Sequence, residues 1–135
     1  MKRRAFLPFL GVLITVLVFA GCATTDHGFY KSKGLPKETL VGLKIDGRII
    51  VSTFDGKTVN WIGPTEKTHR VIITSGVHHL TVSYHDGAYS SVSPTTITFD
   101  FKPGKYYYLK SETDLIRVFY DIEEISESQF TDVKR

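Results

Sequence analysis

The stretch that decides the fold runs from residue 69 to residue 84 and reads His-Arg-Val-Ile-Ile-Thr-Ser-Gly-Val-His-His-Leu-Thr-Val-Ser-Tyr. Two runs rich in β-branched residues meet at Ser75-Gly76. After that point the sequence alternates with the period of two that is typical of a strand with one buried face. The pattern predicts a hairpin that turns at Ser75-Gly76. It also predicts a core-facing row on the second strand: His78, Leu80, Val82 and Tyr84.

Similar runs lie on both sides of this stretch. Asp-Gly at 46–47 and at 55–56 separates β-branched runs, and this dipeptide favours a type I′ hairpin turn because both central residues need φ > 0. Residues 102–105 have the Pro-Gly order of a type II turn. Short strands with a turn about every 8 to 12 residues are typical of a sandwich. We therefore predict one all-β domain over residues 38–122, an antiparallel β-sandwich of about seven strands, immunoglobulin-like or transthyretin-like.

The expected core follows from the inward positions of these strands. The run Ile49-Ile50-Val51 could also serve as an apolar edge that pairs with a partner strand. The predicted core residues are Val51, Val59, Trp61, Ile72, Leu80, Val82, Ile97, Phe99, Phe101, Tyr107, Leu109, Ile116 and Val118.

The N-terminus has the three parts of a secretory signal. Basic residues at 2–4 precede an apolar run from Ala5 to Ala20, and small residues lead to Cys22. A cysteine directly after Ala-Gly resembles the lipobox of bacterial lipoproteins, in which the cysteine is acylated and becomes the first mature residue. Phe19 stands where that motif usually has an aliphatic residue. An ordinary cleaved signal or an uncleaved anchor helix are the alternatives, although the run is short for a span of ~20 residues.

With such a signal the chain has four parts. Residues 1–21 are a cleaved lipoprotein signal peptide, and residues 22–37 are a lipidated Cys22 with a polar tether in which His27 is solvated. The sandwich covers 38–122, and a C-terminal tail covers 123–135. Loss of the signal reduces Lys and Arg from 17 to 14, against 14 Asp and Glu. The mature chain is therefore neutral, which argues against a nucleic-acid partner.

Part of the domain resembles a known family. The resemblance covers residues from Leu35 to Leu109. The residues that match are Gly76, His78, Leu80 and Val82 in the first segment, then Gly104, Tyr107 and Leu109. They are similar to the Pro-Gly-x-His-x-Leu/Ile-x-Val and Gly-Lys-x-Tyr-x-Leu motifs of small bacterial lipoproteins with a PEGA-like or carboxypeptidase-regulatory-like β-sandwich. Ser75 replaces the proline, and either Asp46-Gly47 or Asp55-Gly56-Lys57 could match the family's Asp-Gly-Lys turn. The resemblance implies a fold and an envelope location, and no reaction.

The histidines do not form a metal-binding pattern. His78 and His79 are adjacent in a strand and point to opposite faces, while His79 and His85 lie about 20 Å apart along it. Zinc ligands lie within ~2.1 Å of one ion, so only a distant partner such as His69 could complete a site. We expect no metal and no cofactor. We expect His78 on the core face with a ring nitrogen bonded to a backbone carbonyl.

Catalytic motifs are equally weak. Ser90 and Ser91 lie near His85 and Asp86 in one loop, where such side chains commonly bond the local backbone. We expect no enzyme activity.

The aromatic residues suggest a surface instead. Where Tyr107 and Tyr120 point inward, Tyr106, Tyr108 and Phe119 should point outward as a candidate binding stripe, unless the tether, the tail or the second sheet covers them. We predict a noncatalytic protein-docking module, held in the cell envelope by lipid on Cys22. Cell-wall glycan or small-ligand binding through the exposed aromatics is the alternative. Ala23 favours the outer membrane, facing the periplasm, by the sorting preference of enteric lipoproteins.

Overall fold

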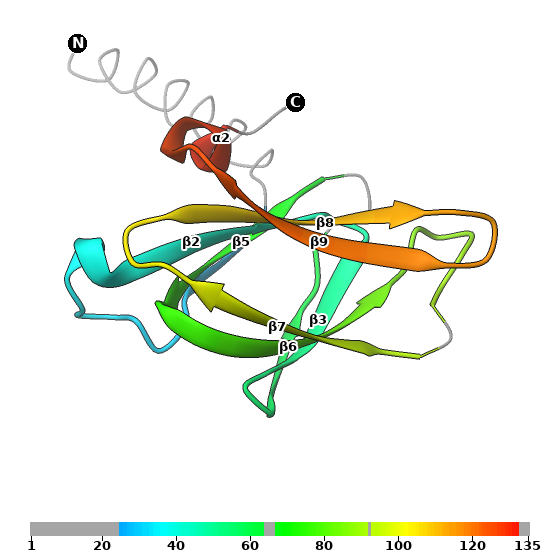
Figure 1. Ribbon diagram of the computed structural model, residues 1–135, viewed down its shortest axis with the longest axis horizontal. Helices are drawn as coiled ribbons and strands as arrows, with labels where there is room; N and C mark the ends of the chain where they lie inside the picture. Colours follow the sequence, from blue (N-terminus) through cyan, green and yellow to red (C-terminus); the bar gives the residue numbers. More distant parts are fainter. Residues whose placement is uncertain (1–24, 64–66, 92, 133–135) are drawn as a thin grey trace, which may run out of the picture.

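The computed structural model describes residues 25–63, 67–91 and 93–132. These residues form nine strands in two sheets that face each other across one core (Figure 1). The five-stranded sheet has the order β1 (Thr25–Phe29), β5 (His69–Thr74), β2 (Leu40–Ile45), β8 (Tyr106–Thr113) and β9 (Val118–Ile125). The four-stranded sheet has the order β4 (Lys57–Trp61), β3 (Ile49–Phe54), β6 (Gly76–Tyr84) and β7 (Thr95–Phe101). The predicted all-β sandwich is confirmed.

Two strand pairs of the five-stranded sheet are parallel, which differs from a purely antiparallel sandwich. β1 runs parallel to β5, and β2 runs parallel to β8, whereas the other pairs are antiparallel. Parallel neighbours cannot be joined by a tight turn. The pairing of β2 with β8 therefore leaves no local turn signal in the sequence. It was missed because periodicity identifies strands and does not identify their partners.

The stretch from residue 69 to residue 84 crosses between the sheets and is not a hairpin. β5 pairs with β2 and β1, while β6 pairs with β3 and β7, so Ser75-Gly76 carries the chain across the core. Gly76 has φ +112°, a value that side-chain-bearing residues rarely adopt. The inward row of β6 is confirmed, since all four predicted side chains are buried.

The face of β5 is the reverse of the prediction. Val71 and Ile73 fill the core and Ile72 faces outward. Paired residues of a hairpin share a face, but the face of β5 is set by its own sheet.

The two Asp-Gly turns also differ in whether the chain stays within one sheet or crosses to the other. At Asp55 and Gly56, φ values of +51° and +78° close a hairpin between β3 and β4, as predicted. Asp46-Gly47 instead joins β2 of one sheet to β3 of the other, with a hydrogen bond from the Ile49 amide to the Asp46 carbonyl at 2.9 Å.

Most of the predicted core is confirmed. Besides Ile72, Ile116 is an error, because its side chain is 77% exposed, and Val118 is only partly buried and lies outside the core cluster. The Asp114 carboxylate accepts hydrogen bonds from the amides of Ile116 and Arg117, which places both residues in the β8–β9 loop. Val59, Ile97 and Phe99 are partly buried and pack against the core. The fully or nearly buried predicted residues are Val51, Trp61, Leu80, Val82, Phe101, Tyr107 and Leu109.

The two ends of the domain are more ordered than the predicted boundaries suggest. Residues 25–29 of the predicted tether form β1, and Lys37–Thr39 form the short 3-10 helix η2. At the other end β9 continues to Ile125 and helix α2 (Glu127–Thr131) follows. β3 lies between β4 and β6, so Ile49-Ile50-Val51 is an interior strand and the predicted apolar edge is wrong.

Cys22 and the signal segment lie outside the described residues. Within the described part of the chain, no helix has the length and apolar character that crossing a membrane requires.

Candidate functional site: a groove beside helix α2

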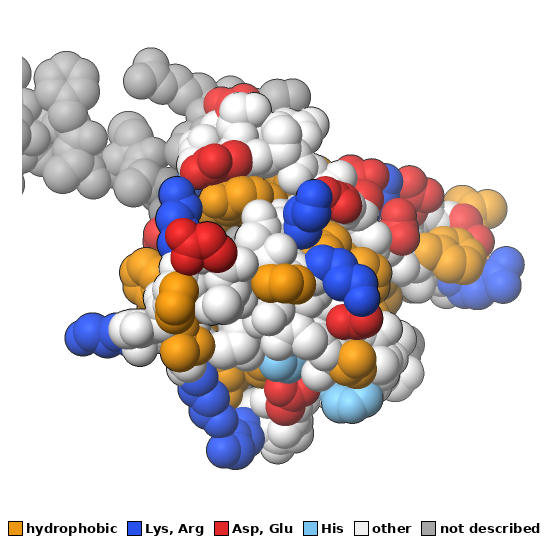
Figure 2. Space-filling view, turned by 60° about the vertical axis from the view of Figure 1, so that its left-hand side comes forward, with side chains coloured by type: hydrophobic (Ala, Val, Ile, Leu, Met, Phe, Trp, Pro, Cys, Tyr) orange, Lys and Arg blue, Asp and Glu red, His pale blue; other side chains and the backbone are white. Residues whose placement is uncertain are grey.

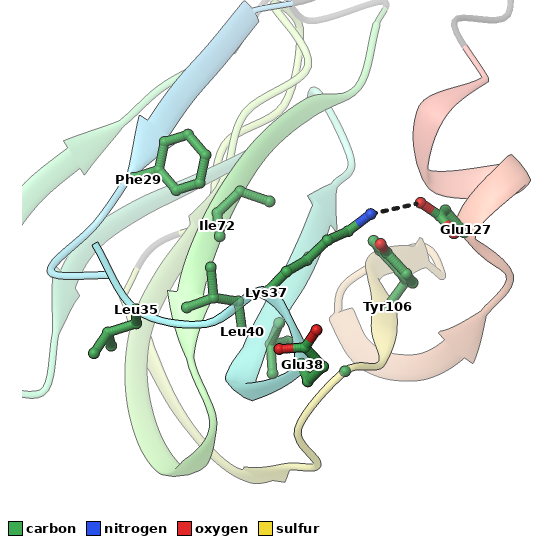
Figure 3. Close-up of a pocket in the computed structure, with 11 residues that line it drawn as sticks. Phe29, Leu35, Lys37, Glu38, Leu40, Ile72, Tyr106 and Glu127 are labelled. Atoms are coloured by element: carbon green, nitrogen blue, oxygen red, sulfur yellow. Dashed lines mark ion pairs between the residues drawn. The ribbon is translucent and has the colours of Figure 1, made fainter. Parts of the chain in front are cut away.

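A groove of about 600 Å³ lies on the outer face of the five-stranded sheet, beside α2 (Figure 3). We call it the outer groove. On this face of the molecule hydrophobic side chains lie among lysines, arginines and acidic residues (Figure 2). The groove is lined by Phe29, Leu35, Lys37, Glu38, Leu40, Val41, Gly42, Ile72, Gly104, Tyr106 and Glu127.

The floor of the outer groove is one row of residues across three strands. Gly42 of β2 lies opposite Ile72 on one side and opposite Tyr106 on the other. A Cβ atom on residue 42 would lie 2.5 Å from the Tyr106 ring and 3.0 Å from the Phe130 ring. Glycine at this position therefore provides the space in which both rings lie.

Helix α2 forms one wall and is fixed to the sheet by several contacts. Its Phe130 side chain is buried and packs on Tyr106, with ring centroids 5.0 Å apart. Lys44 Nζ donates to the Gln129 carbonyl at 2.8 Å, and Arg70 donates to the Phe130 carbonyl at 3.2 Å. These cations bond helical carbonyls that lack partners within so short a helix.

The N-terminus of α2 is fixed by a capping box. Ser126 Oγ accepts from the Gln129 amide, and Gln129 Oε1 accepts from the Ser126 amide. The short helix thus starts and ends at defined residues.

The opposite wall is apolar and open to solvent. Phe29 at the end of β1 is 62% exposed, and Leu35 is 47% exposed. Their segment is fixed from behind, because the Tyr30 amide and the buried Ser32 hydroxyl both donate to the Ile72 carbonyl. The groove therefore has a formed wall with unburied apolar surface.

An ion pair spans the rim of the outer groove. Lys37 Nζ lies 3.5 Å from Glu127 Oε1, with both side chains largely exposed (Figure 3). Partial burial, with the Glu127 carboxylate nearby, raises the pKa of Tyr106 above its usual value. Tyr106 therefore remains a neutral hydrogen-bonding phenol at physiological pH.

The predicted aromatic stripe is not continuous. Tyr106 lines the outer groove and Tyr108 is partly buried, while Phe119 is 49% exposed at the far end of β9 beneath the Arg117 guanidinium. The residues between Tyr108 and Phe119 on this face are charged: Lys110 bonds Glu123 at 3.1 Å and lies 3.8 Å from Asp121. The three predicted residues share one sheet face without forming one apolar surface.

His27 and His69 form a partly buried contact that the sequence analysis did not predict. His27 Nε2 lies 2.7 Å from His69 Nδ1, and His69 Nε2 lies 3.1 Å from the Ile49 carbonyl. Because a carbonyl only accepts, His69 Nε2 is the donor and its Nδ1 accepts from His27. The prediction of a solvated His27 is wrong, since β1 lays this residue against the fully buried His69 and the nearby Trp61. Burial lowers the pKa of His69 to about 4 and also lowers the pKa of His27.

His78 lies where the sequence analysis placed it. Its Nε2 is 2.8 Å from the Thr74 carbonyl, as expected, and its Nδ1 is 2.6 Å from Asp55 Oδ2. Among residues 25–63, 67–91 and 93–132, no three His, Cys, Asp or Glu side chains converge closely enough to hold a metal ion.

The loop with triad residue types uses its side chains locally. His85 Nδ1 lies 2.6 Å from Ser90 Oγ. The Asp86 carboxylate accepts from the Tyr84 hydroxyl and from the amides of Ala88 and Tyr89. The carboxylate therefore stabilises the turn and does not orient the imidazole.

A second polar cluster was also missed. Asp46, only 6% exposed, accepts from Ser111 Oγ at 2.9 Å and from Arg48 Nη2 at 2.7 Å. Burial alone would raise the pKa of Asp46, but these hydrogen bonds hold it below its usual value. Ser111 lies 65 residues away in sequence, so no local pattern identifies the cluster.

Comparison with known proteins gives no relative: no family model, no curated protein and no solved structure matches this chain.

Proposed function

We propose that the protein is a noncatalytic lipoprotein of the bacterial cell envelope that docks a partner protein. Lipid on Cys22 would hold the protein in the outer membrane, with the domain facing the periplasm. The partner would insert an apolar segment into the outer groove. The resemblance to PEGA-like lipoproteins agrees with this proposal and stays a prediction.

The observation that carries the proposal is the exposed apolar wall of the outer groove. Phe29 and Leu35 expose about half or more of their surface on a segment that the sheet holds in place. Burying exposed apolar area contributes roughly 25 cal/mol per Å². The Lys37–Glu127 ion pair at the rim adds charges that could orient the partner.

Protein docking is favoured over glycan or small-ligand binding for a structural reason. Small-molecule sites combine an apolar cavity with several placed polar groups. In the outer groove the charged side chains stand at the rim, and the floor is formed by Gly42, Ile72 and Tyr106, of which Tyr106 alone has a polar side-chain group. The aromatic residues expected to stack on sugars are separated by Lys110, Asp121 and Glu123.

A photoreactive residue at Leu35 in cells tests the docking proposal. We expect an adduct with one defined envelope protein, lost when Phe29 and Ile72 are both changed to Ser. The matched control changes Leu115 and Ile116 to Ser, since these β8–β9 loop residues are 99% and 77% exposed and lie outside the groove. Binding to peptidoglycan sacculi without any protein adduct would replace the proposal with glycan binding.

The anchor has a separate test. Two acyl chains hold a protein on a membrane stably. We expect Cys22→Ser to move the protein from the detergent phase to the aqueous phase in a detergent partition experiment. An unchanged partition would show that Cys22 does not carry the anchor.

A further inference from the structure

The two sheets have four edge strands: β1 and β9 in one sheet, β4 and β7 in the other. An edge strand presents unpaired backbone N–H and C=O groups to which another strand can add. Proteins commonly prevent this with short strands, bulges or charged side chains. The four edges of this protein differ in these respects.

β1 and β4 are short and irregular. β1 has five residues, and its register with β5 shifts between Asp26 and Phe29, where Gly28 has φ +71°. β4 also has five residues, begins with Lys57, and contains Asn60 at φ +52°; the register of β3 with β4 shifts between Val51 and Thr53. Neither strand offers a regular edge.

β9 is long and charged. It has eight residues, of which Asp121, Glu123 and Glu124 are acidic. These carboxylates pair with Lys105 and Lys110 of β8, so a strand added at this edge would have to accommodate a row of ion pairs, and charged side chains of this kind oppose pairing.

β7 is longer than β1 and β4, regular, and carries fewer charges than β9. Its seven residues, Thr-Thr-Ile-Thr-Phe-Asp-Phe, pair with β6 at seven consecutive positions without a shift. Its single charge is Asp100, which forms an ion pair with Lys102 at 2.6 Å. The inward side chains of Ile97 and Phe99 are only partly buried, because this side of the sandwich is open. β7 and β9 lie toward the viewer in Figure 1.

The hydrogen bonds of the neighbouring strand show which backbone groups of β7 face the edge. The His79 amide donates to Asp55 Oδ1, and the His79 carbonyl accepts from the Asp55 amide, so residue 79 of β6 bonds toward β3. Backbone groups alternate along a strand, so residues 78 and 80 bond toward β7, where they meet Phe99 and Ile97. The backbone groups of Thr96, Thr98 and Asp100 consequently point to the open edge.

We infer that β7 pairs with β7 of a second copy of this chain, antiparallel, about a two-fold axis at Thr98. Thr98 is the central residue of the strand, and only this centre pairs all seven residues. It places Ile97 opposite Phe99 of the partner copy on the inner face, which extends the core of each sandwich. It places Asp100 opposite Thr96 rather than opposite the second Asp100. The two four-stranded sheets then join as one sheet of eight strands.

Disulfide trapping tests the contact in the full-length protein in detergent. Directly opposed residues of an antiparallel hydrogen-bonded pair have Cα atoms ~5.5 Å apart, inside the range that a disulfide spans. We expect Thr98→Cys to give a covalent dimer under mild oxidation. The wild type with Cys22 alone and Glu123→Cys on the β9 edge are the controls, and both should remain monomeric on non-reducing gels. If either control forms as much covalent dimer as Thr98→Cys, the inference is overturned. It is also overturned if none of the three proteins forms a covalent dimer.

Two lysine variants test the register. Thr98→Lys brings two ammonium groups together at the axis and should weaken the dimer roughly fivefold. Thr96→Lys places each ammonium group opposite Asp100 of the other copy and should leave the dimer as strong or stronger. Sedimentation equilibrium over a range of concentrations measures both. Equal weakening by the two variants, or monomers at every concentration in the wild type, contradicts the two-fold axis at Thr98.

A proline variant separates pairing from folding. The Thr98 amide faces the open edge, so Thr98→Pro removes no backbone hydrogen bond of the sheet. It loses the exposed contact of Thr98 Oγ1 with His79 Nδ1 at 2.8 Å and should preserve the circular dichroism spectrum. It removes both amide donors at the axis and should abolish the dimer. Dimer retention by a folded Thr98→Pro protein would overturn the inference. The groove variant with Phe29 and Ile72 changed to Ser should still dimerise, because the outer groove lies on the other sheet.

Discussion

The Asp-Gly turn at 46–47 and the Asp-Gly turn at 55–56 begin with the same dipeptide and direct the chain differently. At 55–56 both residues have positive φ and the chain returns within its own sheet. At 46–47 the chain leaves the five-stranded sheet and enters the four-stranded one. The dipeptide permits a turn, and the contacts of the aspartate decide which turn forms.

The two aspartates differ in how far their side chains are buried. Asp46 is buried and bonds Ser111 and Arg48, while the Asp55 side chain is 40% exposed and bonds His78 and the His79 amide. A buried histidine also supports the crossing turn, because His69 Nε2 donates to the Ile49 carbonyl. The crossing turn thus depends on tertiary contacts, and the hairpin turn depends more on local backbone conformation.

The largest expected effect is the pH dependence of the crossing turn. Burial holds the pKa of His69 at about 4, below its unfolded value of 6.5. Below pH 6.5 the unfolded chain binds a proton at this residue that the folded chain does not. The stability present above pH 6.5 should therefore fall by about 3 kcal/mol as pH drops toward 4.

Urea unfolding at several pH values measures this loss. His69→Gln should flatten the pH dependence, because an amide can still donate to the Ile49 carbonyl and does not titrate. A flat wild-type profile between pH 6.5 and 4 would contradict the prediction.

Removal of the buried carboxylate should have the next largest effect. Asp46→Ala leaves the Ser111 hydroxyl and the Arg48 guanidinium without their acceptor and should cost about 2–3 kcal/mol. Asp121→Ala is the control, since this carboxylate is 69% exposed and should change stability by less than ~0.5 kcal/mol. Equal losses for the two variants, measured by urea unfolding, would show that the Asp46 cluster contributes no more than a surface charge.

The hairpin aspartate should contribute less. Asp55→Ala removes acceptors for the His79 amide and for the His78 ring, and we expect a loss of about 1–2 kcal/mol. Asp55→Asn keeps an acceptor and tolerates positive φ, so its loss should be smaller. A thermal unfolding series that ranks Asp55→Ala above Asp46→Ala would reverse the comparison between the turns.

The smallest effect should come from the backbone of the hairpin turn. Gly56 has φ +78°, and no heavy atom beyond the adjacent residues lies within 4 Å of the position that a Cβ atom would occupy, so Gly56→Ala introduces conformational strain and no steric clash with the rest of the fold. We expect a loss of about 1 kcal/mol. Gly56→Asn should lose less, because asparagine adopts left-handed conformations more readily. Equal unfolding midpoints for wild type and Gly56→Ala would show that the positive φ of this residue does not require glycine.

The contrast between the two turns also explains what the sequence could predict. Strand positions, the inward row of β6 and the contact of His78 with the Thr74 carbonyl follow from local periodicity and elementary hydrogen bonding. The crossing at Ser75-Gly76 does not, since a chain that returns to its own sheet and one that enters the facing sheet can share the same residue pattern. Ile72 was assigned to the wrong face for this reason.

The candidate site was less predictable than the fold. Tyr106 was recognised as outward-facing, but the outer groove joins it to Phe29, Leu35 and Glu127, which lie far apart in the sequence. Residues 22–37 are mostly polar, so the sequence analysis predicted a tether there and did not predict β1. The signal that could have identified the groove was Gly42, because a glycine inside a mostly apolar strand often marks a close approach of another group.

The position of β1 has a consequence for where a partner can be found. β1 begins at Thr25, three residues after Cys22. Three residues span at most about 11 Å. A lipid on Cys22 would therefore hold the start of β1 within about that distance of the acylated residue. The protein would search for its partner by lateral diffusion in two dimensions, and a partner must present its apolar segment close to the lipid headgroups of the same membrane.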